Sequence, residues 1–220
     1  DVFGALDPEQ FTDAFVQWMK TIATLSDVIA LDGKTIRHSH DTALGKSAIH
    51  MVSAWSAHNR LILGQMKVDD KSNEITALPR LLQLLDVKGC LVTIDAMGCQ
   101  TGIAQQIVEQ DGDYLLDGKK NQECLFEDID HLVKHSNAEK FKAEGFDEHR
   151  TVGKEHGRLE IRHCQVISAP DWLDHLRHRR DWKKLHSIVR LCAERQMGGK
   201  TSQECRYYIC SRDAPASELL

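Results

Sequence analysis

The sequence lacks several features, and each absence narrows the class of protein. No apolar run approaches the roughly 20 residues that span a bilayer, so we expect no membrane association. The seven cysteines include no C-x-x-C pair and are odd in number. This pattern predicts reduced thiols in a cytoplasm, with neither a disulfide framework nor a thiolate zinc site. The opening residues 1–4 do not resemble a secretory signal.

No charge of one sign dominates the chain. The 28 Lys and Arg residues stand against 33 Asp and Glu residues, which gives a net charge of −5. A nucleic-acid partner would therefore have to be held by local basic patches. The 220 residues suit one large domain or a core with a smaller insert, and no internal repeat or low-complexity tract is present.

Two aspartates, Asp32 and Asp95, each follow an apolar run that is typical of a buried strand. Two close carboxylates repel each other unless a cation neutralises them, and Mg²⁺ prefers oxygen ligands. If the two strands are neighbours, the pair would form half of a metal site. The alternative is that each aspartate only caps a turn or a following helix.

Periodicity predicts an α/β arrangement followed by a β-rich segment. Helices are expected over residues 7–22, 73–85, 100–109 and 123–133. The first is expected to be amphipathic, with an apolar face of Phe11, Phe15, Trp18, Met19 and Ile22. Strands are expected over residues 28–32, 49–57, 61–68, 90–95 and 114–116, the first three as an antiparallel meander. Residues 136–157 are polar and charged, and further strands are expected over 159–166, 187–194 and 204–211, with a turn at 198–200 between the last two.

Ordered motifs along nearly the whole chain resemble the H-repeat-associated transposase family. They lie at residues 29–37 (IALDGKTIR), 71–75 and 77–79 (KSNEI, ALP), 93–96 with Gln100 (TIDA), 112–114 (GDY) with Lys119 and 121–122 (NQ), 156–162 (HGRLEIR) and 206–209 (RYYI). Several motifs in one order are far more specific than any one of them.

The resemblance implies a DDE-type insertion-sequence transposase of the bacterial cytoplasm. The implied fold is α/β, a ribonuclease H-like mixed sheet with flanking helices and a β-rich insert near the C-terminus. The implied regions are 1–26 (end of an N-terminal helical region), 27–135 (catalytic core), 136–203 (β-rich insert) and 204–220 (return strand of the core). The implied partners are DNA, as insertion-sequence ends and target, and a second copy of the chain in a synaptic homodimer.

In this family two aspartates and a glutamate hold two Mg²⁺ or Mn²⁺ ions for phosphoryl transfer. Asp32 and Asp95 fall on the first two acids. The third belongs on a helix with a Trp-x-x-Glu-Asn type motif after the Tyr-Tyr-Ile strand, and no such motif occurs up to Leu220. Glu160 is either a substitute metal ligand or a strand residue paired with Arg158 or Arg162. We therefore expect a fragment or the product of a disrupted gene.

Several basic residues are candidates for DNA contact. Lys34 and Arg37 follow Asp32, and Lys119 and Lys120 follow the strand at 114–116; each could contact phosphate or lie in a solvated turn. The run 177–180 (RHRR), with Trp172, Trp182, Lys183 and Lys184 nearby, could hold a DNA backbone or be a solvated face. The spacings His38 with His40 and His156 with His163 match no zinc motif, so surface histidines are expected.

Two other functions remain open on the sequence. The chain could be a noncatalytic DNA-binding or dimerising transposase remnant, or a metal-dependent nuclease of a host system. DNA affinity that does not depend on Asp32 would favour the remnant, and cleavage without preference for transposon ends would favour the nuclease.

Overall fold

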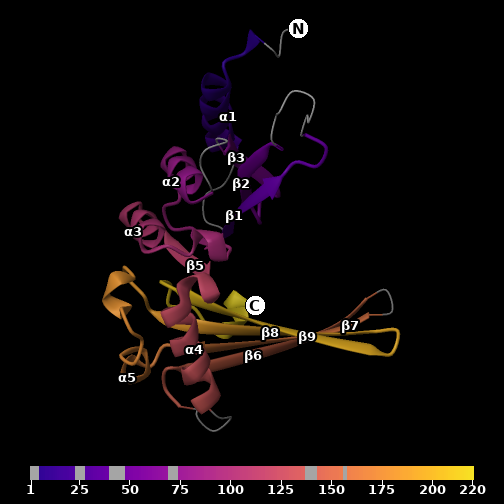
Figure 1. Cartoon of the computed structure of the whole chain (residues 1–220), viewed down its shortest axis with the longest axis vertical. Helices are drawn as coiled ribbons and strands as arrows, with labels where there is room; N and C mark the ends of the chain where they lie inside the picture. Colours follow the sequence, from indigo (N-terminus) through magenta and orange to yellow (C-terminus); the bar gives the residue numbers. More distant parts are fainter. Residues whose placement is uncertain (1–4, 23–27, 40–47, 69–73, 137–142, 156–157) are drawn as a thin grey trace. The chain divides into compact units, whose positions relative to one another are not determined.

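The computed structural model describes residues 5–22, 28–39, 48–68, 74–136, 143–155 and 158–220 (Figure 1). The chain divides into two compact units, Asp1–Tyr114 and Leu115–Leu220, and each is described by itself. Residues 71–73 of the second motif, together with His40 and residues 156–157, lie outside the described residues.

The first unit combines a mixed sheet with helices. Its elements are α1 (Pro8–Ile22), β1 (Val28–Thr35), β2 (His50–Ser56), β3 (Leu61–Lys67), α2 (Glu74–Leu84), β4 (Leu91–Ile94), η2 (Ala96–Gly98) and α3 (Thr101–Glu109). The strands lie in the order β3-β2-β1-β4. β1 pairs antiparallel with β2, β2 antiparallel with β3, and β1 parallel with β4. The predicted meander and the predicted mixed sheet are confirmed.

The two faces of this sheet differ. Leu31, Ala54 and Gly64 are cross-strand neighbours, and a Cβ atom on Gly64 would lie 3.2 Å from both Val16 of α1 and Leu81 of α2. That face is therefore covered by helices. Direct cross-strand partners share a face. The alternate residues are half-buried or exposed, and Asp32 and Trp55 are among the exposed ones. Polar side chains on the uncovered face can reach solutes.

Helix α1 confirms the predicted helix but not its predicted buried face. The Asp7 carboxylate accepts hydrogen bonds from the backbone N–H groups of Glu9 and Gln10, as a capping residue does. The apolar residues expected on one face were Phe11, Phe15, Trp18, Met19 and Ile22. Of these only Met19 is buried, together with Val16, whereas Phe11, Trp18 and Ile22 are exposed.

The second unit is built on an antiparallel sheet. Its elements are β5 (Asp113–Asp117, which begins in the first unit), η3 (Lys120–Gln122), α4 (Glu123–His135), β6 (Phe146–Glu155), β7 (Arg158–Ile167), α5 (Pro170–Leu173), η5 (Arg179–Asp181), β8 (Ser187–Met197), β9 (Lys200–Cys210) and α6 (Ala216–Leu219). The strands lie in the order β5-β9-β8-β7-β6. The turn of the β8–β9 hairpin is made by Gly198 and Gly199, both with positive φ, as the predicted turn requires.

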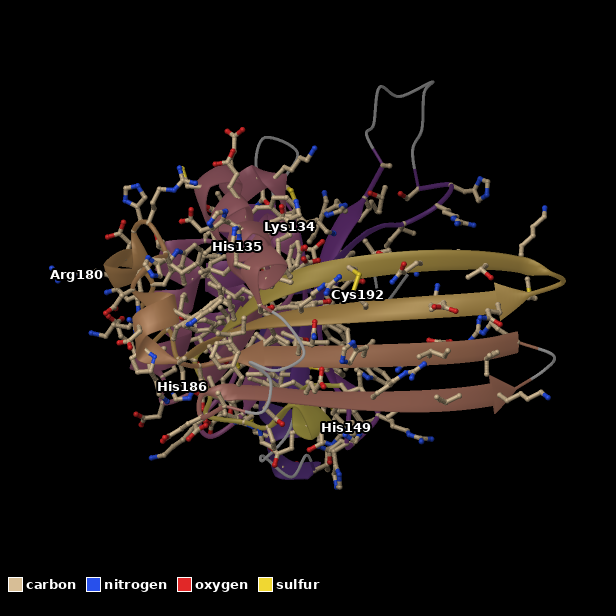
Figure 2. The ribbon with its side chains drawn as sticks, turned by 90° about the horizontal axis from the view of Figure 1, so that it is seen from below. Lys134, His135, His149, Arg180, His186 and Cys192 are labelled. Carbon is tan, nitrogen blue, oxygen red and sulfur yellow. A yellow bond between two sulfur atoms is a disulfide. The ribbon has the colours of Figure 1, made fainter. Side chains whose placement is uncertain are left out.

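The strands of the second unit are buried at one end only. Side chains of Val166, Ile188 and Ile209 are buried there, and α4 contributes the buried Leu125 and Ile129. Beyond this core the strands continue as two long hairpins (Figure 2), whose residues are half-buried or exposed toward the turns.

One strand of this unit was not predicted, and one expectation was wrong. Residues 136–157 were described only as polar and charged, yet residues 146–155 form β6, because β7 pairs with them over ten consecutive positions. The chain was also expected to hold only reduced thiols. Cys192 and Cys205 are direct partners in the β8–β9 ladder, with Cα atoms 4.1 Å apart, and they form a disulfide. The hairpin register, which spacing alone does not reveal, brings the two residues together.

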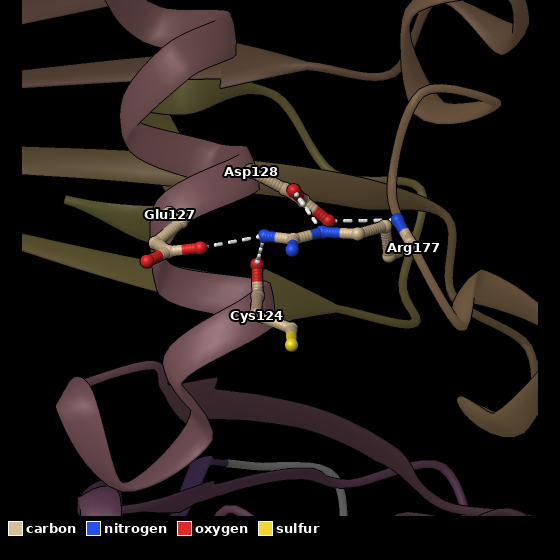
Figure 3. Close-up of polar contacts among 4 residues, drawn as sticks. All are labelled: Cys124, Glu127, Asp128 and Arg177. Carbon is tan, nitrogen blue, oxygen red and sulfur yellow. Dashed lines mark hydrogen bonds and ion pairs between the residues drawn. The ribbon is translucent and has the colours of Figure 1, made fainter.

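Arg177 anchors the segment after α5 to helix α4 (Figure 3). Its guanidinium contacts the Glu127 and Asp128 carboxylates at 2.8 Å each and donates to the carbonyl oxygen of Cys124 at 3.2 Å. Its backbone N–H also donates to Asp128 at 2.7 Å. These contacts raise the pKa of Arg177 above its ordinary value. The side chain is thus held within the unit.

We predict that Arg177→Gln lowers the denaturant midpoint of unfolding. The substitution leaves the Asp128 side chain, which is only 12% exposed, without its charged partner. Arg180→Gln, which removes the same charge from an exposed position of the same segment (Figure 2), should leave the midpoint unchanged. Equal midpoints for both variants in urea titrations followed by circular dichroism would contradict the anchoring role.

Candidate functional site

The structure brings Asp32 and Asp95 together. Leu31 and Ile94 are the last paired residues of the parallel β1–β4 ladder, and the two aspartates follow them directly. Neighbouring strands lie about 4.8 Å apart. Both aspartates are exposed. Two carboxylates therefore stand side by side at one end of the pair, as the metal-site interpretation requires.

The capping alternative holds for one aspartate and not for the other. The Asp95 Oδ1 atom accepts a hydrogen bond from the Met97 N–H at 3.1 Å, so Asp95 caps η2. An ionised carboxylate has two oxygens and about four acceptor positions. Capping therefore leaves Asp95 able to bind a cation. Asp32 lies inside β1, which continues to Thr35 in its ladder with β2, and it starts no helix.

Sequence reasoning missed two polar neighbours of Asp32. Ser53 of β2 is its direct cross-strand partner, and Gln65 of β3 is the partner of Ser53. The Gln65 amide donates to the Ser53 hydroxyl at 3.1 Å. A polar row thus runs from Gln65 through Ser53 and Asp32 to Asp95. The alternation of apolar and polar residues in β2 and β3 was visible in the sequence. The pairing register between β1, β2 and β3, which aligns Gln65, Ser53 and Asp32, was not.

A closely packed turn fixes the backbone that carries Asp95. Gly98 ends η2 and is buried, and its N–H donates to the Asp95 carbonyl oxygen at 3.1 Å. A Cβ atom on Gly98 would overlap the Ile94 side chain and would lie 3.0 Å from Leu78. Only glycine fits there, so the turn sits directly against the core.

The basic residues predicted to contact DNA fall in both units. Lys34 and Arg37 are exposed in the first unit, Lys34 two residues beyond Asp32 on β1. In the second unit, the Lys119 ammonium lies 3.2 Å from the buried Asp117 carboxylate, and Lys120 is exposed at the start of η3. Lys119 is thus ion-paired, whereas Lys34, Arg37 and Lys120 present their side chains to solvent.

Glu160 lies in β7 of the second unit and is held by arginines. Its carboxylate lies 2.9 Å from the guanidinium groups of both Arg158 and Arg162, and 3.9 Å from that of Arg195. The hydrogen bond from Arg162 and the nearby positive charges hold the pKa of Glu160 below its ordinary value. Of the two alternatives considered for Glu160, the strand residue paired with arginine is the one that these contacts match.

The basic run at 177–180 is largely neutralised. Arg177 is bound to α4, Arg179 forms an ion pair with Asp174, and the His178 ring lies 3.6 Å from the Asp181 carboxylate. Arg180 remains exposed at the end of the unit opposite the hairpin turns (Figure 2). The solvated-face interpretation fits this run better than a DNA-binding one.

Among the residues that the structure describes, no group of three or more His, Cys, Asp or Glu side chains is arranged so that it could hold a metal ion. His163 pairs with Glu148 at 3.0 Å. Within the same described segments, no helix has the length and apolar character needed to cross a membrane.

Comparisons with known proteins agree with the motifs. Residues 23–220 match the family described as transposase DDE domain. An uncharacterized protein in the dhlA 3′ region of Xanthobacter autotrophicus is 40% identical over 216 residues, which cover 97% of this chain and 70% of that protein. The H repeat-associated putative transposase YhhI of Escherichia coli K12 is 40% identical over 227 residues, covering 99% of this chain and 58% of that protein.

Other matches extend these findings. The putative transposase YncI of Escherichia coli O157:H7 is 41% identical, and the match covers 99% of this chain and 56% of that protein. This chain therefore spans little more than half the length of these Escherichia coli relatives. Among solved structures, a piggyBac transposase synaptic complex with hairpin DNA aligns with a TM-score of 0.47 at 10% identity, covering 94% of this chain and 38% of that chain.

We predict that Gly98→Ala destabilises the protein by about 1–3 kcal/mol, because the added methyl group forces Ile94 or the turn to move. Gly102→Ala is a matched control, since Gly102 lies four residues away in α3 and has open space around its Cβ position. The control should be neutral or stabilising by up to about 1 kcal/mol, since alanine favours helix. Urea unfolding measures both changes, and equal effects would contradict the packing argument.

Proposed function

Because the chain belongs to the transposase DDE domain family, we propose that Asp32 and Asp95 are the first two acids of a DNA-processing site. The observation that carries this proposal is their position directly after Leu31 and Ile94, the last pair of a parallel ladder. The two carboxylates then bind divalent cations between them.

We further propose that the first unit has a ribonuclease H-like arrangement. Support comes from the strand order β3-β2-β1-β4, with an antiparallel meander followed by a parallel fourth strand. In this view residues 27–135 form the catalytic core and residues 1–26 the end of a helical region. Residues 136–203 form an insert, and residues 204–220 return to the core.

The donor set fits Mg²⁺ or Mn²⁺. Both side chains are carboxylates, both are exposed, and hard divalent cations prefer oxygen ligands. When bound, such cations activate an attacking hydroxyl and stabilise the leaving oxygen of a phosphodiester. The chain itself positions the carboxylates: the β1–β2 ladder fixes Asp32, and the Met97 N–H orients Asp95.

DNA is the proposed substrate, and a second copy of the chain is the proposed partner in a synaptic homodimer. Lys34 and Arg37 are proposed to contact DNA phosphates beside Asp32, since both are exposed near it along β1 and the turn that follows. Lys119 and Lys120 are proposed for the same role from the second unit. The Lys119 contact competes with its ion pair to Asp117.

We predict that the Asp32→Asn variant is more stable than the wild type without metal and less stable than the wild type with metal. In EDTA the variant should be more stable by up to about 1 kcal/mol, because one of two neighbouring negative charges is removed. In Mn²⁺ or Mg²⁺ the wild type should gain stability by mass action, and the variant should gain much less. Thermal unfolding across a metal titration tests this, and an equal metal-induced shift in both proteins would refute the metal site.

We predict Mn²⁺-dependent nicking of supercoiled plasmid DNA that is lost in both Asp32→Asn and Asp95→Asn. Asp111→Asn is the matched control, since Asp111 is an exposed aspartate of the same unit whose positive φ of 58° asparagine tolerates. It should keep wild-type activity. Turnover that survives Asp95→Asn but not Glu160→Gln would overturn the assignment of acids.

The assay also distinguishes the alternative function. A noncatalytic DNA-binding or dimerising remnant would show no nicking, together with DNA affinity that falls steeply with salt and is unchanged by Asp32→Ala.

A further inference from the structure

One face of the long hairpins in the second unit carries a cluster of charged side chains that the acid pair does not use. Cross-strand partners share a face, and in these ladders Glu160 pairs with Arg195, Ala193 with Glu204, and Leu191 with Arg206. We call the resulting set the arginine face. It consists of Arg158, Glu160, Arg162, Arg195, Glu204 and Arg206.

The glutamates hold the arginines in place. The Glu160 side chain is only 12% exposed and contacts Arg158 and Arg162 at 2.9 Å. Glu204 accepts a hydrogen bond from Arg206 at 2.8 Å. These contacts hold the pKa of each glutamate below its ordinary value, so both are ionised at neutral pH. The carboxylates therefore fix the guanidinium groups without covering them.

The arginines remain available to a ligand. The side chains of Arg158, Arg162, Arg195 and Arg206 are each about half exposed, although they project from regular strands. A guanidinium has five N–H donors, and one contact to a carboxylate leaves several of them. Four arginines against two glutamates give the face a net positive charge, in a chain whose net charge is −5.

The face is also hollowed. A depression of about 210 Å³ is lined by Arg162, Arg195 and Arg206, together with Glu160, Glu204 and Tyr208. Guanidinium groups bind phosphate oxygens through paired, charge-assisted hydrogen bonds, and they do so best when they are positioned in advance. A row of fixed arginines across three strands therefore suits a ligand with repeated phosphates.

We propose that the arginine face binds the phosphodiester backbone of duplex DNA. The choice of DNA among polyanions rests on the proposed function, whereas the anion site rests on the geometry of the face. The arginine face contains none of the basic residues proposed above to contact DNA, which are Lys34, Arg37, Lys119 and Lys120. Contacts to phosphate oxygens carry no sequence information, so we expect this binding to be independent of DNA sequence.

The test measures DNA affinity as a function of salt. Fluorescence anisotropy with a labelled duplex, in EDTA so that no metal site contributes, gives the slope of log K against log salt concentration. The triple variant Arg162→Gln, Arg195→Gln, Arg206→Gln should reduce the magnitude of that slope by about 2 to 3, since each lost phosphate contact releases about one counterion fewer. Its affinity at about 0.1 M salt should fall at least tenfold.

The single variant Arg150→Gln is the control, because Arg150 projects from β6 on the opposite face, where it pairs with His163. It should leave the slope unchanged, whereas the loss of one phosphate contact would reduce the magnitude of the slope by about 0.9. If the triple variant remains folded by circular dichroism and keeps the wild-type slope, the proposal is wrong.

A second variant changes binding in the opposite direction, which misfolding cannot imitate. Glu204→Gln removes an exposed negative charge from the face, while the glutamine amide oxygen can still accept the hydrogen bond from Arg206. It should tighten DNA binding about two- to fivefold with a steeper slope. Glu194→Gln removes the same charge from the opposite face and should have less effect. Equal effects of the two variants would overturn the proposal.

The outcomes separate this proposal from the proposed function. Loss of nicking in Asp32→Asn with wild-type DNA affinity supports the acid pair and leaves the arginine face to be judged by its own variants. Unchanged affinity in the arginine variants, with nicking intact, contradicts the arginine face alone.

Discussion

The parallel pairing of β1 with β4 is the contact on which the candidate site depends. Because successive residues of a strand point to opposite faces, a register shift of one position in either strand would turn an aspartate toward the helices. The buried Leu31 and Ile94 oppose such a shift, since each would then be exposed. The same apolar residues that form the core therefore also set the spacing of the two carboxylates.

Both units use strand ladders to position charge, but they do so in different ways. In the first unit, two aspartates follow neighbouring strands, and like charges so placed repel each other. In the second unit, charges of opposite sign alternate across β7, β8 and β9, and they hold one another in place. The proposed metal site rests on the first arrangement, and the proposed DNA-binding face rests on the second.

Local sequence signals predicted most of the elements. The leucines of α2, the caps of α1 and the glycines of the β8–β9 turn each express a short-range preference, and each element forms where expected. Strand β6 was missed because its residues are polar and its stability comes from the ladder with β7. The exposed Trp18 on α1 was misjudged because periodicity reports an apolar stripe but not what covers it.

The site was predicted as far as residues alone can specify it. Asp32 and Asp95 were singled out because a carboxylate after an apolar run is a local signal; β1 and β4 are indeed neighbours, and the role of the two acids stays a prediction. Ser53, Gln65 and the Cys192–Cys205 pair depend on the register between strands, which is set by loops and packing far from the residues themselves. The family resemblance supplied the order of the acids and their chemistry, but not these neighbours.

The long separation along the chain between the paired aspartates has a consequence for synthesis. Asp32 leaves the ribosome well before Asp95. The β1–β4 contact forms only when the chain between the two strands closes into a long loop. β2, β3 and α2 all lie between the two aspartates. A nascent polypeptide that stops before β4 therefore contains Asp32 but not Asp95. Such incomplete products lack the neighbouring carboxylates of β1 and β4.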